Sequence, residues 1–157
     1  GLVPAVIDDG HVLRESNTIV RYLCTKHGAD RLYPRDPLVR AGVEQWMDWA
    51  NYETSISLRG AFLGGQLNEP PWNNPWFIEQ GRRQITKEVG QLEDHFTAGG
   101  PYVTGSAFTI ADIPIGLVVN RWFNLKFDRP DYPAVARYYE LLTERPAYRA
   151  HVRNGMP

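Results

Sequence analysis

Apolar residues follow one spacing at the start of the chain and another through the rest of it. Residues 5–8 and 11–13 form two short apolar runs, and an Asp-Gly pair at 9–10 separates them. Such a pair predicts a two-residue β-hairpin, because the turn requires positive φ angles at its central positions. Apolar residues over 19–24 then recur at helical spacing, and Ser16 is a favoured N-cap residue. The opening stretch therefore predicts two antiparallel strands followed by a helix that starts at Ser16.

From residue 38 onward the apolar spacing is helical almost throughout. A proline-punctuated stretch at 31–37 cannot continue a helix and indicates a linker between two domains. The helices predicted beyond it cover about 38–63, 78–96, a segment starting at 109, and then 132–145 and 146–154.

The helix start at 109 carries the most complete capping pattern in the chain. Phe-Thr-Ile-Ala-Asp at 108–112 puts Thr109 at the predicted N-cap and Asp112 three residues later. In a capping box the hydroxyl accepts from the main chain of the third residue, whose carboxylate reaches back to the cap N–H. We interpret Thr109 and Asp112 as residues of folding rather than of chemistry.

Composition narrows the class of protein without defining a function. The 157 residues are 43% hydrophobic and 22% charged, with a formal net charge of −1, which is typical of a globular protein. This balance predicts no nucleic-acid partner, and no apolar run is long enough to predict a membrane span. The single cysteine, Cys24, excludes an intrachain disulfide, fits a reducing cytosol and is interpreted as a small core residue. The four histidines have no metal-ligand spacing, so no metal site is predicted.

The predicted hairpin and helix combine groups that suit a small peptide ligand. The free N–H groups of a helix start favour an anion, and the Ser16 hydroxyl adds a donor. Glu15 is placed to accept from an ammonium group, so the pair suits an amino acid's carboxylate and amine. A cis peptide bond at Pro4 would turn the main chain of Val3 toward a ligand. Each residue also has a purely structural interpretation: Ser16 as a helix cap, Pro4 as a trans proline at a strand start, and Glu15 as a solvated side chain.

The stretch GLVPAVIDDGHVLRESNTIVRYL at 1–23 resembles the second half of the thioredoxin-like domain of cytosolic, bacterial-type glutathione S-transferases. T-I-A-D at 109–112 resembles the buried capping box of the helical domain of that family, and R-P-A-Y-R at 145–149 is similar to its bacterial members. The resemblance implies a partial thioredoxin-like domain of α+β class at 1–30, a linker at 31–37 and an all-α C-terminal domain at 38–157.

The same resemblance implies the roles of individual residues. Val3 would pair with the cysteinyl main chain of glutathione, and Pro4 would be the cis residue. Glu15 and Ser16 would hold the γ-glutamyl amine and carboxylate. The expected substrate pocket lies along the first long helix of the second domain, with candidate residues Tyr52, Ile56, Arg59 and Trp122.

The activity implied is conjugation or reduction of apolar electrophiles by the glutathione thiolate, in a cytoplasmic homodimer with a role in detoxification. The residue that activates the thiol, together with the first β-α-β portion of the domain, is expected upstream of Gly1. Two alternatives on the same fold stay open. One is a non-catalytic binding or interaction module, and the other is a glutathione-dependent dehalogenase or isomerase.

Overall fold

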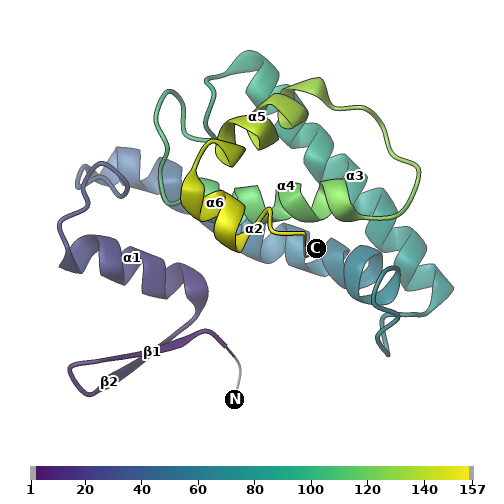
Figure 1. The fold of residues 1–157 in the computed structure, drawn as a ribbon, viewed down its shortest axis with the longest axis horizontal. Helices are drawn as coiled ribbons and strands as arrows, with labels where there is room; N and C mark the ends of the chain where they lie inside the picture. The colour runs from purple at the N-terminus through teal and green to yellow at the C-terminus, as the bar shows by residue number, and fades with distance from the viewer. Residues whose placement is uncertain (1–2, 156–157) are drawn as a thin grey trace.

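The structure is a computed structural model that describes residues 3–155. A β-hairpin and one helix lie beside a larger group of helices, as Figure 1 shows. The elements in chain order are β1 (Ala5–Asp8), β2 (His11–Arg14), α1 (Ser16–Lys26), α2 (Pro37–Leu58), the π-helix η1 (Arg59–Gly64), α3 (Pro75–Ala98), α4 (Asp112–Asn124), α5 (Pro133–Thr143) and α6 (Pro146–His151).

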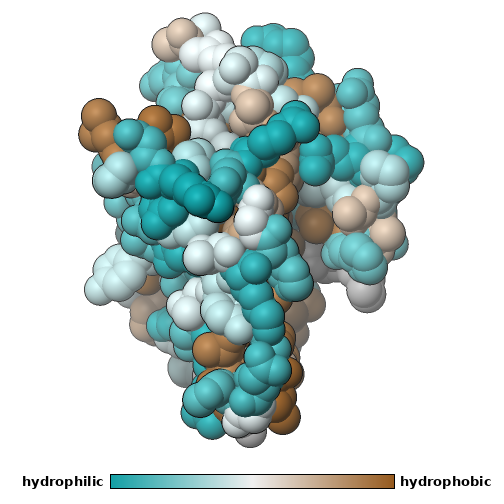
Figure 2. Space-filling view, turned by 90° about the vertical axis from the view of Figure 1, so that its left-hand side faces the viewer, coloured by the Kyte–Doolittle hydropathy of each residue, from teal (hydrophilic) through white to brown (hydrophobic). Residues whose placement is uncertain are grey.

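The hairpin forms as its turn residues predict. Asp9 and Gly10 have φ angles of 47° and 78°, and the antiparallel register pairs Ala5 with Arg14. Ile7 and Val12 face each other across the strands and are 74% and 57% exposed. Figure 2 shows hydrophobic side chains at the lower end of its view, where the hairpin lies. This small sheet therefore presents an uncovered apolar face among the described residues.

The long helix α2 lies at the centre of the helical group and contacts α3, α4 and η1. A continuous helix over about 38–63 was predicted, but the α-helix ends at Leu58 and a π-helix completes the segment. The wider turn is visible in the main-chain bond from the Gly65 N–H to the Gly60 carbonyl at 2.9 Å. Its cause is close contact, because Gly60 and Gly64 lie directly against the main chain of Phe77 and Trp72. π-Helical turns occur frequently at functional sites.

The start of α4 differs from the predicted capping box in one of its two bonds. The Thr109 N–H donates to Asp112 Oδ2 at 2.8 Å, as predicted. The Asp112 N–H, however, donates to the main-chain carbonyl of Thr109 at 3.1 Å rather than to its hydroxyl, and Ala111 is the N-cap. The hydroxyl is not needed because a tight turn satisfies that N–H. Asp112 therefore holds this helix start, while Thr109 contributes mainly its main chain.

The hairpin unit is attached to the helical group by bonds on both sides of the linker. Asn17 Nδ2 donates to the Met47 carbonyl at 2.9 Å, and Arg21 pairs with Asp48 at 2.7 Å. The Ile110 N–H donates to the Leu32 carbonyl at 3.1 Å. These contacts place the start of α1 beside the middle of α2. Among the described residues, no helix has both the length and the apolar character to cross a membrane.

Candidate functional site

The first part of the candidate site is the end of the hairpin nearest to α1. The Val3–Pro4 peptide bond is cis, and Glu15 has a positive φ of 66°. Continuing the antiparallel register beyond Ala5 and Arg14 brings Val3 opposite Ser16. A positive φ at a non-glycine residue is uncommon and is concentrated at ligand-binding and catalytic positions. The turn into α1 therefore brings together Val3, Glu15 and Ser16, the residues that sequence reasoning selected.

Ser16 does not cap α1 as predicted. It is the first residue of the helix, Glu15 is the N-cap, and no side chain bonds the free N–H groups. The positive φ of Glu15 shifts the helix start by one residue, which takes the Ser16 hydroxyl away from the capping position. An exposed hydroxyl beside uncapped N–H groups is free to bind a ligand.

The polar groups at this corner have no partners within residues 3–155. Neither the Val3 main chain, the Glu15 carboxylate nor the Ser16 hydroxyl takes part in a hydrogen bond with another described residue. The open N–H groups of the α1 start and the helix dipole favour an anion. The carboxylate of Glu15 favours a cation beside it. This arrangement suits an α-amino acid group, with an extended main chain running along Val3.

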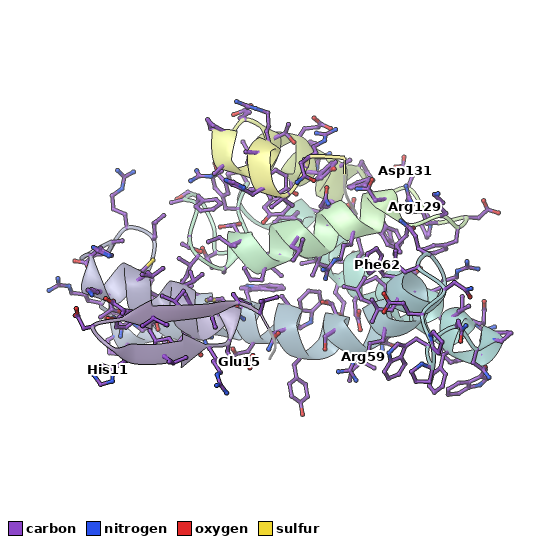
Figure 3. All side chains as sticks on the ribbon, turned by 60° about the horizontal axis from the view of Figure 1, so that its bottom comes forward. His11, Glu15, Arg59, Phe62, Arg129 and Asp131 are labelled. Carbon is purple, nitrogen blue, oxygen red and sulfur yellow. The ribbon has the colours of Figure 1, made fainter. Side chains whose placement is uncertain are left out.

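The second part of the candidate site is a cavity of about 530 Å³ between α2, η1 and α3. Three of the four predicted pocket residues, Tyr52, Ile56 and Arg59, line it. Trp122 does not, and its assignment to the pocket is wrong: its side chain is 1% exposed and stacks on Tyr132 inside the core. Because Trp122 lies on the inner face of α4, its helical spacing indicated the core and not a pocket. Figure 3 shows Glu15 and Arg59 on the same side of α2.

The cavity also contains residues that sequence reasoning did not select. They come from the 65–74 loop and from α3: Trp72, Trp76, Phe77, Gln80, Gln84 and Glu88. The aromatic residues of PPWNNPWF at 70–77 were the signal in the sequence for this part of the cavity. The proline and asparagine residues among them indicated a loop instead of a binding site. These residues join the site only because α3 runs back along α2.

Glu88 is a buried carboxyl group at the floor of this cavity. It is 1% exposed, and its two oxygens accept from Ser57 Oγ at 2.6 Å and from Gln84 Nε2 at 2.9 Å. Burial raises the pKa of Glu88 above its ordinary value, and the two hydrogen bonds oppose that rise. A carboxyl group of this kind binds an additional proton in the folded state over a pH range that begins near its ordinary pKa.

Stability is expected to depend on pH through Glu88. Because the pKa of Glu88 is higher in the folded state, its contribution is fully present below the ordinary value of 4.5 and is lost as the pH rises through the folded-state pKa. The stability of Glu88→Gln relative to the parent chain should therefore increase from pH 4.5 toward pH 8. Urea unfolding at several pH values measures this difference.

Glu79→Gln is the matched control for that experiment, because Glu79 lies on the same helix and forms an exposed ion pair with Arg83 at 2.6 Å. Its relative stability should change little over the same range. A constant difference between Glu88→Gln and the parent chain at every pH would contradict the expectation.

Cys24 is separate from both parts of the site. Its side chain is buried in the core, and burial raises the pKa of its thiol. A thiol with a raised pKa is a poor nucleophile, because the thiolate is the reactive form. The interpretation of Cys24 as a core residue is confirmed.

The comparisons with known proteins agree with this architecture. Residues 75–141 match the family model described as "Glutathione S-transferase, C-terminal domain". The chain is 35% identical over 151 residues to the glutathione S-transferase GstB of Escherichia coli strain K12, covering 95% of this chain and 72% of that protein. It is 30% identical to the disulfide-bond oxidoreductase YfcG of the same organism, covering 92% of this chain and 68% of that protein.

Among solved structures, a theta class glutathione S-transferase from Xanthomonas axonopodis pv. citri with glutathione bound superposes with a TM-score of 0.86 at 33% identity. That comparison covers 96% of this chain and 72% of the solved chain. The hairpin, α1 and the helical group thus have the arrangement of a bacterial glutathione transferase. The chain belongs to the glutathione S-transferase family.

Proposed function

We propose that this chain binds glutathione at the end of the hairpin and acts as a glutathione transferase. Ser16 and the α1 start hold the γ-glutamyl carboxylate, and Glu15 holds the γ-glutamyl amine. Val3 precedes the cis peptide bond at Pro4, and its main chain pairs with the cysteinyl main chain of glutathione. The observation that carries this proposal is the set of unpartnered polar groups that Val3, Glu15 and Ser16 present within the described residues.

We propose that the α2–α3 cavity receives the electrophile. The glutathione thiol first loses its proton to solvent, the resulting thiolate sulfur forms a bond to an electrophilic carbon or sulfur of the substrate, and the displaced group departs with the electron pair of the bond that breaks. Tyr52, Ile56 and Arg59 line this cavity and are the proposed substrate contacts. The names of the relatives GstB and YfcG support both conjugating and disulfide-reducing chemistry as candidates for the reaction.

Glutathione affinity tests the first part of the proposal. Ser16→Ala is expected to weaken glutathione binding about tenfold or more, because a hydrogen bond to a charged group contributes about 1.5–3 kcal/mol. Glu15→Gln is expected to weaken it by a similar factor. Isothermal titration calorimetry with the parent chain and both variants gives the dissociation constants.

A second ligand makes that experiment specific for the γ-glutamyl group. Cysteinylglycine lacks this group, so neither variant should change its affinity. Thr25→Ala, at the opposite end of α1, is the matched control and should bind glutathione as the parent chain does. Unchanged glutathione affinity in both Ser16→Ala and Glu15→Gln would exclude the hairpin end as the binding site.

We propose the domain division 1–30, 31–37 and 38–157 for this chain. The family model over 75–141 supports the helical part, and the hairpin followed by α1 supports the first part. A homodimer, a cytoplasmic location and a role in detoxification complete the proposal. Exposed apolar residues such as Ile7, Val12 and Leu38 support a contact between subunits.

A further inference from the structure

We propose that the α2–α3 cavity selects flat aromatic molecules that carry an anionic group, and that Arg59 recognises this group. The inference rests on the proposed function, because it names the substrate class for the cavity that receives the electrophile. Three features of the cavity carry it: an arginine without an acidic partner, walls made of aromatic rings, and carboxylates placed at the other end.

Arg59 is a cation without an acidic partner in the described part of the chain. Its guanidinium lies 5.2 Å from the centroid of the Trp72 ring, and no ion pair or hydrogen bond joins it to another described residue. Arg83, which lines the same cavity, has its charge paired with Glu79 at 2.6 Å. Of these two arginines, Arg59 therefore has the charge that is available to bind an anion.

The wall next to Arg59 is aromatic. Phe77 contacts Trp72 at 5.7 Å and Trp76 at 5.1 Å between ring centroids, both in edge-on geometry. The Trp76 side chain is 63% exposed, although it stands in this cluster. An edge-on contact covers one face of one ring and leaves the other faces of the pair uncovered by it, and a flat ligand ring gains by stacking on a face that remains exposed, as at Trp76. The Arg59 guanidinium, which lies over Trp72, places a positive charge at the edge of this aromatic wall.

The acidic residues of the cavity lie away from Arg59, so the two ends of the cavity differ in charge. Glu88 is bonded to Ser57 and Gln84, and Glu53 is near enough to affect its charge. Between these carboxylates and the aromatic wall lies the crossing of the helices, where Gly60 is packed against Phe77 and Gly81. An anionic group is attracted to the Arg59 end of the cavity, so it lies beside Arg59 and Trp72.

Two ligands of nearly the same shape test this inference. The probes are 4-nitrobenzoate, which is an anion, and 4-nitrobenzamide, which is neutral. Equilibrium dialysis in the absence of glutathione is expected to give about fivefold tighter binding of 4-nitrobenzoate to the parent chain, a ratio in the range of exposed charge pairs. Arg59→Met should remove this preference and keep binding of 4-nitrobenzamide, because methionine still covers Trp72.

Arg83→Met is the matched control, because it removes the same charge from the same cavity but from an arginine that is already paired. It should keep the preference for 4-nitrobenzoate. The inference is overturned if the parent chain shows no preference, if Arg59→Met keeps it, or if Arg83→Met loses it to the same extent. Glutathione affinity is measured separately. Glutathione binding without the preference refutes only this inference, whereas the preference without glutathione binding supports the role of Arg59 and refutes the proposed function.

Discussion

Asp112→Ala is expected to lower the free energy of unfolding by about 4 kcal/mol, because it leaves several buried donors without an acceptor. Asp112 is 1% exposed and accepts from the Thr109 N–H at 2.8 Å, the Val103 N–H at 3.0 Å and the Tyr138 hydroxyl at 3.0 Å. Burial raises the pKa of Asp112, and these donors oppose the rise. Urea unfolding followed by circular dichroism measures the loss.

The control for this variant comes from the other residue of the predicted capping box. Thr109→Val keeps the main chain and the shape of the side chain but removes the hydroxyl, whose shortest contact is to Thr104 at 3.1 Å. It should cost about 1 kcal/mol. An equal loss of stability in the two variants would contradict the assignment of the main role at the start of α4 to the Asp112 carboxylate.

A methyl group at Gly60 is expected to cost on the order of 3 kcal/mol, because the main chains of η1 and α3 are in direct contact there. An ideal Cβ at Gly60 would lie 2.0 Å from the Phe77 carbonyl oxygen and 3.1 Å from the Gly81 Cα. Neither atom belongs to a side chain that can rotate away, so the two helices must separate. Thermal and urea unfolding of Gly60→Ala measure the cost.

Gly42→Ala is the matched control for Gly60→Ala, because Gly42 lies in the same run of helix and a Cβ there meets no atom within 4 Å. It should stabilise the chain by about 0.5–1 kcal/mol through helix propensity. If both substitutions stabilised the chain, the close contact between η1 and α3 would not exist in solution.

Elements whose cause is local were predictable from the sequence. The Asp9-Gly10 turn needs only two residues that accept positive φ, and the hairpin forms around it. Helical spacing likewise indicated α3, α5 and α6 within a few residues of their observed ends. The end of α2 was not predictable, because the change to η1 depends on the main chain of Phe77 and Trp72 lying against its glycines.

The two parts of the candidate site also differed in how far the sequence could predict them. Val3, Glu15 and Ser16 are close along the chain or across one hairpin, so the sequence was enough to group them. The cavity was only half predictable. Tyr52 and Ile56 of α2 and Arg59 at the start of η1 follow one another at helical spacing, whereas the aromatic wall and Glu88 come from a segment that packs against them. Trp122 is a large aromatic residue at helical spacing, as a pocket residue could be, but it is buried in the core.

The sequence alone determined the order of the elements, because this depends on turns and spacing along the chain, and its resemblance to a known family indicated that family and the residues proposed to hold glutathione. The tertiary structure decided three matters. It assigned the acceptor role at the start of α4 to Asp112, it left the Ser16 hydroxyl free, and it placed an unpaired Arg59 beside Trp72. Each depends on which groups find a partner after folding and which do not, and that is settled by contacts between residues distant in the sequence or by the geometry of a single turn.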